Sequence, residues 1–153
     1  MPDQRDCQVC DVIQDDPRRL LTTEHWLISL AVDQGYLGRA WVTLRQHKGD
    51  LAELAPVEWT ELHEVIRRYE AAVRAAFGAQ LFNWSCLMND AFKATHPAPH
   101  VHWHVRPRYD RPVQVEGVEF ADPNFAHHYD RQYIRPVDEA MQQAIMRQIK
   151  THL

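Results

Sequence analysis

The sequence has few cysteines, no excess of basic residues and no long apolar run, and each shortage argues against a class of protein. Three cysteines in 153 residues are too few for a secreted disulfide framework, so we expect a reducing, cytoplasmic setting. With 17 Lys and Arg against 21 Asp and Glu, the formal net charge of -4 does not suit a surface that neutralises a nucleic-acid backbone. The apolar stretches are too short for a membrane span or a secretion signal. We therefore expect neither a nucleic-acid polymer nor a membrane as partner.

The chain also lacks repeats, low-complexity tracts and Gly/Ser linkers, so it offers no boundary at which to divide it. Its content of 45% apolar and 25% charged residues fits one globular domain of ordinary size. We expect a single domain over residues 1–153, with a core at about 5–110 and a C-terminal extension at 111–153.

Hydrophobic periodicity predicts strands and two helices. The segments 25–32 and 38–44 have the composition of strands joined by a turn around Asp33, and 81–88 and 100–105 have that of two more. Residues 56–78 show the three-and-four spacing of an amphipathic helix. Its expected buried stripe is Trp59, Leu62, Val65, Ile66, Tyr69, Ala72 and Val73. A second helix is expected over 137–152, and this mixture predicts an α+β domain with an antiparallel sheet.

Ten histidines are the unusual feature of the composition, and three of them alternate with apolar residues in HVHWHV at 100–105. Residues two apart in a strand lie on the same face, roughly 6.7 Å from each other. We therefore expect His100, His102 and His104 to share one face, while the residues between them face the core. The alternative is a histidine-rich polar edge of a half-buried strand, but polar faces normally mix Thr, Lys, Glu and Gln.

The segment HVHWHVRPRY resembles the signature of the histidine triad (HIT) family, in which three histidines alternate with apolar residues and Pro-Arg often follows. The resemblance is specific in this motif and extends more weakly from Cys7 to about Tyr109. It implies a HIT-like sheet of about five strands with a long central helix and a C-terminal helix. It also implies that His102 is the nucleophile on the α-phosphorus, forming a nucleotidyl-histidine that water resolves. His104 would donate a hydrogen bond or charge to the phosphoryl oxygens, and His100 would sit on the other side.

The resemblance extends to possible substrate contacts. Asn89 lies eleven residues before His100, where family members carry an Asn or Gln that reaches the substrate. An Asn that caps the loop is an equal alternative. Asp33 is the acidic residue nearest to the family's ribose-binding position, although its register differs by about two positions. The loop before the triad is Thr-His-Pro-Ala-Pro rather than Gly-Gln-Ser or Gly-Gln-Thr, so His96 takes the Gln position and is expected to contact the leaving group.

The pair of cysteines near the N-terminus suggests a metal. A lone CxxC fits a redox pair, a zinc half-site or coincidence. In zinc-bearing HIT proteins and the related uridylyltransferases, two N-terminal cysteines, a histidine after the second strand and the first triad histidine bind one metal. The resemblance thus implies a structural zinc held by Cys7, Cys10, His47 and His100. Cys86, inside an apolar strand pattern, is expected to be a buried packing residue.

Three functions are consistent with these residues. The first is a nucleotide hydrolase or nucleotidyl transferase acting on dinucleoside polyphosphates or adenosine phosphoramidates. The second is a hydrolase whose three triad histidines hold a catalytic zinc, although three successive histidines on one strand subtend a poor tetrahedron. The third is a non-catalytic nucleotide-binding module, against which the intact triad argues. We also expect a homodimer, with Trp59 and the aromatic segment around Phe125 as candidate contacts, the latter lying against a neighbouring subunit or the nucleotide base.

Overall fold

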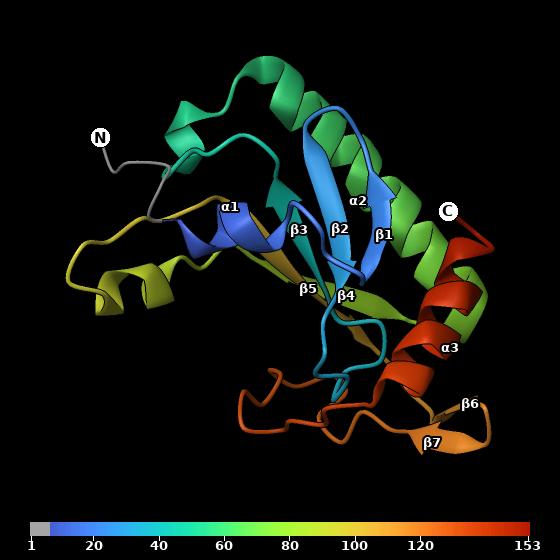
Figure 1. Cartoon of the computed structure of the whole chain (residues 1–153). Coiled ribbons are helices and arrows are strands. Elements are labelled where there is room, and N and C mark those ends of the chain that lie inside the picture. The colour runs from blue at the N-terminus through green and yellow to red at the C-terminus, as the bar shows by residue number, and fades with distance from the viewer. Residues whose placement is uncertain (1–6) are drawn as a thin grey trace.

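The structure is a computed structural model that describes residues 7–153, and it has the expected α+β architecture (Figure 1). The predicted start of the core, at about residue 5, lies outside these residues. The five strands of the main sheet are antiparallel and are ordered β1 (Arg19–Thr22), β2 (Trp26–Leu30), β3 (Ala40–Leu44), β5 (His102–Arg108) and β4 (Leu81–Ser85). Among residues 7–153 none of the helices combines the length and apolarity needed to cross a membrane.

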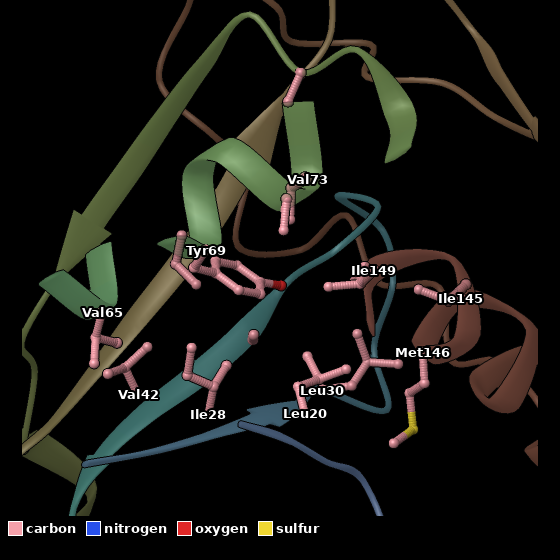
Figure 2. Close-up of a cluster of buried hydrophobic side chains, with 14 of the residues drawn as sticks. Leu20, Ile28, Leu30, Val42, Val65, Tyr69, Val73, Ile145, Met146 and Ile149 are labelled. Carbon is pink, nitrogen blue, oxygen red and sulfur yellow. The ribbon is translucent and has the colours of Figure 1, made fainter. Parts of the chain in front are cut away.

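Two helices cover one face of this sheet and bury the core (Figure 1). They are the long helix α2 (Pro56–Phe77) and the C-terminal helix α3 (Glu139–Lys150). Ile28 and Val42 lie opposite each other on β2 and β3 and are fully buried with Tyr69 of α2 and Ile149 of α3 (Figure 2). The strands therefore present one apolar face to the helices and leave the other free for polar side chains.

The remaining elements are short. Helix α1 (Gln8–Val12) precedes the sheet, and a two-stranded hairpin of β6 (Val113–Val115) and β7 (Val118–Phe120) follows it. Two 3-10 helices, η2 (Leu51–Glu53) and η3 (Asn89–Lys93), lie in the loops before α2 and before β5.

The expected buried stripe of α2 is wrong at Trp59, which is 41% exposed. Glu58 occupies the buried position in the first turn, where its carboxylate accepts hydrogen bonds from the Ala55 backbone N–H and from Lys48 Nζ, each at 2.6 Å. These bonds compensate the burial of the Glu58 charge and, with the desolvation that opposes them, leave its pKa below the ordinary value. Glu58, with its charge paired in this way, therefore occupies the buried position that periodicity assigns to Trp59.

All four predicted strands have different bounds in the structure, and the differences at β4 and β5 concern the site. Pairing between β4 and β5 ends at Ser85, which lies opposite His104, so the strand expected over 81–88 is three residues shorter. Strand β5 begins at His102 rather than at residue 100, and the side chain of His100 lies in a cluster with His47 and two cysteines. The expected shared face of three histidines is therefore reduced to a pair, His102 and His104.

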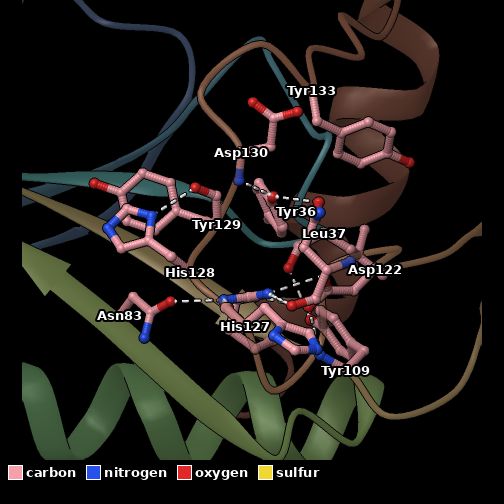
Figure 3. Close-up of polar contacts among 12 residues, drawn as sticks. Tyr36, Leu37, Asn83, Tyr109, Asp122, His127, His128, Tyr129, Asp130 and Tyr133 are labelled. Atoms are coloured by element: carbon pink, nitrogen blue, oxygen red, sulfur yellow. Dashed lines mark hydrogen bonds and ion pairs between the residues drawn. The ribbon is translucent and has the colours of Figure 1, made fainter.

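The C-terminal extension is fastened to the sheet by a buried arginine, Arg108. Its guanidinium forms an ion pair with Asp122 at 2.7 Å and donates to Asn83 Oδ1 and to the backbone carbonyls of Asn124 and His127 (Figure 3). Both side chains of the ion pair are at most 2% exposed. A second attachment pairs Asp33 with Pro136 in an isolated β-bridge. Together these contacts bring the segment after residue 120 over the polar side of the sheet.

The Arg108–Asp122 ion pair leads to a stability prediction. Asp122→Ala leaves the buried guanidinium without its counter-ion, so we expect the free energy of unfolding to fall by about 3–5 kcal/mol. Urea denaturation followed by circular dichroism measures this. The matched control is Asp110→Ala, because its partner Arg111 is 71% exposed and a surface pair contributes only about 0–1 kcal/mol. Equal losses in the two variants would contradict the structural role of the buried pair.

Candidate metal centre and active site

Four side chains from three parts of the chain meet beside the start of β5. Their ligand atoms all lie within 4.8 Å of one another. His100 Nδ1 is 3.4 Å from the sulfur of each cysteine and 3.3 Å from His47 Nδ1. With metal–ligand bonds of about 2.0–2.3 Å, atoms at the corners of a tetrahedron lie roughly 3.3–3.8 Å apart. The spacing and the donor set fit zinc, and the chain therefore carries the zinc site predicted from its sequence, with the ligands Cys7, Cys10, His47 and His100.

The surroundings of the cluster prepare these atoms for a metal. His100 Nε2 lies 2.6 Å from the carbonyl oxygen of Leu44, so it carries the proton and leaves Nδ1 free to ligate. Both cysteines are free thiols, and burial, together with Cys7, raises the pKa of Cys10 to about 12 in the metal-free chain. A divalent cation offsets that desolvation, so metal binding and thiol deprotonation are coupled.

His102 lies at the start of β5, and one of its ring nitrogens is engaged in a hydrogen bond. Its Nδ1 is 2.7 Å from the carbonyl oxygen of His100 and must donate to it, since a carbonyl only accepts. The other nitrogen, Nε2, then carries a free electron pair. Burial lowers the pKa of His102, although the bond to His100 opposes the shift, so the imidazole is neutral at pH 7. A neutral imidazole of defined tautomer is the form that can attack phosphorus.

His104 lies next on the same face and is packed in aromatic rings. Its ring centroid is 5.1 Å from that of His102 and 4.3 Å from that of Trp41, the residue opposite it on β3. Burial lowers the pKa of His104 to about 4, so in the free protein it is uncharged at neutral pH. Its Nδ1 is buried without a hydrogen-bond partner among the described residues. His104 therefore offers a polar ring nitrogen, and not a fixed positive charge, to a ligand.

A pocket opens beyond His104 along β5, away from His102. Asn89 and Asp33 both line it, whereas His96 is exposed in the loop before the triad and does not. The Asp33 carboxylate accepts hydrogen bonds from the backbone of Gly35 and Arg135 and pairs with Arg39. It thus already holds the C-terminal segment in place, a use that the sequence did not suggest. Cys86 is partly buried against the core, as expected.

Several pocket residues were not expected from the sequence. Arg106 lies two residues after His104 on the same face of β5. Extending the two-residue alternation of the triad by one step would have predicted that it faces the same side. Arg39 and Trp41 come from β3 and the turn before it. Tyr129 and Tyr133 come from the C-terminal extension, and Tyr129 belongs to the aromatic segment that was expected to lie near a base or a subunit. Aromatic density marked the segment that holds Tyr129, but no local signal assigned either tyrosine to this pocket, because the contacts that place them join distant parts of the chain.

Loss of a metal ligand is expected to cost metal and stability together. Purified protein should contain one zinc per chain, and Cys10→Ser should lower this content and the unfolding midpoint, because the binding free energy is part of the folding free energy. Metal analysis and thermal denaturation measure the two effects. Cys86→Ser, outside the cluster, serves as the control and should keep its zinc. Absence of stoichiometric zinc from fresh wild-type protein would contradict the prediction.

Comparison with solved structures identifies similar folds. A Zn-bound histidine triad family protein from Mycobacterium smegmatis is 19% identical over 96% of this chain and 95% of its own, with a TM-score of 0.61. A hypothetical histidine triad nucleotide-binding protein from Sulfolobus tokodaii is 18% identical over 95% of this chain and 93% of its own, with a TM-score of 0.64. A HIT family protein from Bacillus anthracis is 29% identical over 69% and 75%, with a TM-score of 0.57.

Comparison with curated proteins gives no significant match. The family model of the HIT domain matches residues 13–111, which include His47, the triad and all five strands of the main sheet. The N-terminal cysteines and the extension that carries Tyr129 lie outside the matched range. Since the match covers well over half of its length, this chain belongs to the HIT domain family.

Proposed function

We propose that this protein is a nucleotide hydrolase or nucleotidyl transferase that acts at the α-phosphate of small nucleotides through a covalent intermediate on His102. The observation that carries the proposal is the hydrogen bond from His102 Nδ1 to the carbonyl of His100, which leaves Nε2 free. Dinucleoside polyphosphates and adenosine phosphoramidates are the substrate classes. The Sulfolobus tokodaii neighbour, described as nucleotide-binding, is consistent with this choice.

In the proposed reaction His102 Nε2 forms a bond to the α-phosphorus while the bond from phosphorus to the leaving group breaks. The imidazole ring gains positive charge, which the Nδ1–H bond to the His100 carbonyl stabilises. A water molecule then attacks the same phosphorus, the P–N bond breaks, and His102 returns to its neutral form. His104 contributes a hydrogen bond to a phosphoryl oxygen in both steps. Cys7, Cys10, His47 and His100 would hold the zinc, which would supply folding free energy and fix the ring of His100.

Two alternatives have less support. A catalytic zinc on the three triad histidines competes with the cysteine cluster for His100, whose Nδ1 lies among sulfur and nitrogen ligands and whose Nε2 is bonded to Leu44. The donor set therefore favours the closed site, which leaves no open position for substrate. A non-catalytic binding module requires no defined tautomer at His102, so the Nδ1 bond argues for turnover.

Further roles complete the proposal. Asn89 and Asp33 border the bound nucleotide, and His96 approaches the leaving group when substrate is present. The free cysteines suit a cytoplasmic setting. The chain acts as one domain, since both helices of its core lie on one sheet.

A homodimer is also proposed, with exposed Trp59 and the partly buried Phe125 as contacts.

Replacing the nucleophile is expected to separate bond cleavage from binding. His102→Ala should abolish turnover of a diadenosine polyphosphate while zinc stays at one per chain, because the side chain is no metal ligand. His104→Ala should slow turnover by roughly 10²–10³-fold, as for one lost oxyanion donor. Wild-type protein quenched at alkaline pH should carry a nucleotidyl adduct detectable by intact mass. His63→Ala is the control, because that histidine is 70% exposed on α2; retained turnover in His102→Ala would refute the mechanism.

The protonation state of His102 predicts a pH profile. Protonation removes the electron pair of Nε2, and burial lowers the pKa of His102 below the ordinary 6.5. We therefore expect kcat/KM to be constant above pH 6.5 and to fall on acidification through the lowered pKa. Circular dichroism over the same range controls for acid unfolding. An acid limb centred at or above pH 6.5 in folded protein would contradict the assignment.

A further inference from the structure

Arg106 is a buried cation on the functional face of the sheet. It lies two residues after His104 on β5 and opposite Asn83 on β4. Arg106 is only 7% exposed, yet it lines the pocket beyond His104. Successive residues on one face of a strand are separated by roughly 6.7 Å, so Arg106 is about 13 Å from His102 along the strand and one step beyond His104.

The guanidinium of Arg106 is unsatisfied. Its Nη1 is buried without a hydrogen-bond partner, and within residues 7–153 no carboxylate forms an ion pair with it. The Asp33 carboxylate, whose charge acts on Arg106, already pairs with Arg39, and Arg39 adds a second positive charge close by. The ring of Tyr129 lies 4.2 Å from the Arg106 guanidinium carbon and covers one side of it. This cation–π contact offsets part of the desolvation but supplies no hydrogen-bond acceptor.

Arg108, the next residue on the same face, shows what the chain provides when a buried arginine is structural. It is 1% exposed, and its nitrogens reach the Asp122 carboxylate, the Asn83 side chain and two backbone carbonyls. A buried charge without such partners destabilises a fold. Both arginines are buried on the same strand, and the contrast between them indicates that the partner of Arg106 comes from outside the chain.

We propose that Arg106 binds a second anionic group of the substrate, separate from the phosphate attacked by His102. The inference rests on the proposed function and narrows its substrate class to nucleotides with at least two anionic groups. The planar guanidinium suits a phosphate, either a further phosphate of a polyphosphate chain or one on the ribose. Tyr129 holds the guanidinium toward the pocket, and Arg39 adds to the positive potential.

Nucleotide binding in the absence of turnover tests this role. Zinc-loaded His102→Ala protein is titrated by calorimetry with adenosine, AMP, ADP, ATP and adenosine 3′,5′-bisphosphate. We expect ADP and ATP, or the bisphosphate, to bind more tightly than AMP, which identifies the source of the second phosphate. Adding Arg106→Met should weaken the tighter ligands by roughly 10- to 100-fold, as for the loss of a charged hydrogen bond, and leave adenosine unchanged.

Two further variants separate binding from structure. Arg106→Lys keeps the charge but not the fork of donors, and it should retain part of the affinity. Arg111→Met, at an exposed arginine, should change no affinity. Arg106→Met should unfold at the same temperature as its parent or higher, because an unpaired buried charge is removed.

The possible failures are distinguishable. Equal affinities for all phosphorylated ligands before and after Arg106→Met would overturn the second anion site and leave the proposed function intact. A marked loss of thermal stability in Arg106→Met would also overturn it, because the guanidinium would then have a structural partner. Failure of every nucleotide to bind would overturn the proposed function together with the inference.

Discussion

The structure depends on His100 serving two sites at once. Its ring lies among the zinc ligands and is oriented by the Leu44 carbonyl. Its own backbone carbonyl accepts a hydrogen bond from Nδ1 of His102. The metal centre and the proposed nucleophile are thus connected through a single residue. The pairing of β3 with β5 places Trp41 and Thr43 directly opposite His104 and His102, and so fixes the backbone from which both rings extend. A rigid strand held by a metal is a suitable support for a nucleophile that must keep one tautomer.

The region that matches the HIT domain and the C-terminal extension contribute different parts of the site. The region that matches the HIT domain, residues 13–111, carries the triad, Arg39 and Arg106. The extension after it supplies the opposite wall of the pocket, including Tyr129 and Tyr133. The Arg108–Asp122 ion pair and the Asp33 carboxylate hold that wall against the sheet. The triad histidines therefore lie on the part of the chain that matches the family, and the shape of the pocket depends on a segment outside that match.

Burial has opposite consequences at Arg106 and Arg108. Around Arg108 the extension provides enough acceptors to compensate a fully buried charge, and the result is attachment of one segment to another. Around Arg106 it provides an aromatic face and leaves Nη1 unpaired. A protein can tolerate such a local cost where the rest of the fold is well packed, as it is between α2, α3 and the sheet.

The sequence by itself determined the elements whose signals are local. The spacing of Leu62, Val65 and Tyr69 predicted α2. The alternation at His102 and His104 predicted a strand and suggested a histidine nucleophile. Both patterns can be recognised from a few neighbouring residues. The zinc ligands were found through the family resemblance, since no spacing rule joins Cys7 to His100. Strand β1, with four residues, and the hairpin of β6 and β7 were not predicted, because such short segments carry little periodicity.

Only the tertiary structure decided which polar groups meet. The inward turn of Glu58 in place of Trp59 depends on Lys48, and the use of Asp33 as an attachment depends on Arg135. The difference between a paired Arg108 and an unpaired Arg106 depends on Asp122 and on residues that follow it. These outcomes are set by contacts between residues far apart in the chain, where the compensation of a buried charge is a property of the assembled fold and not of any local pattern.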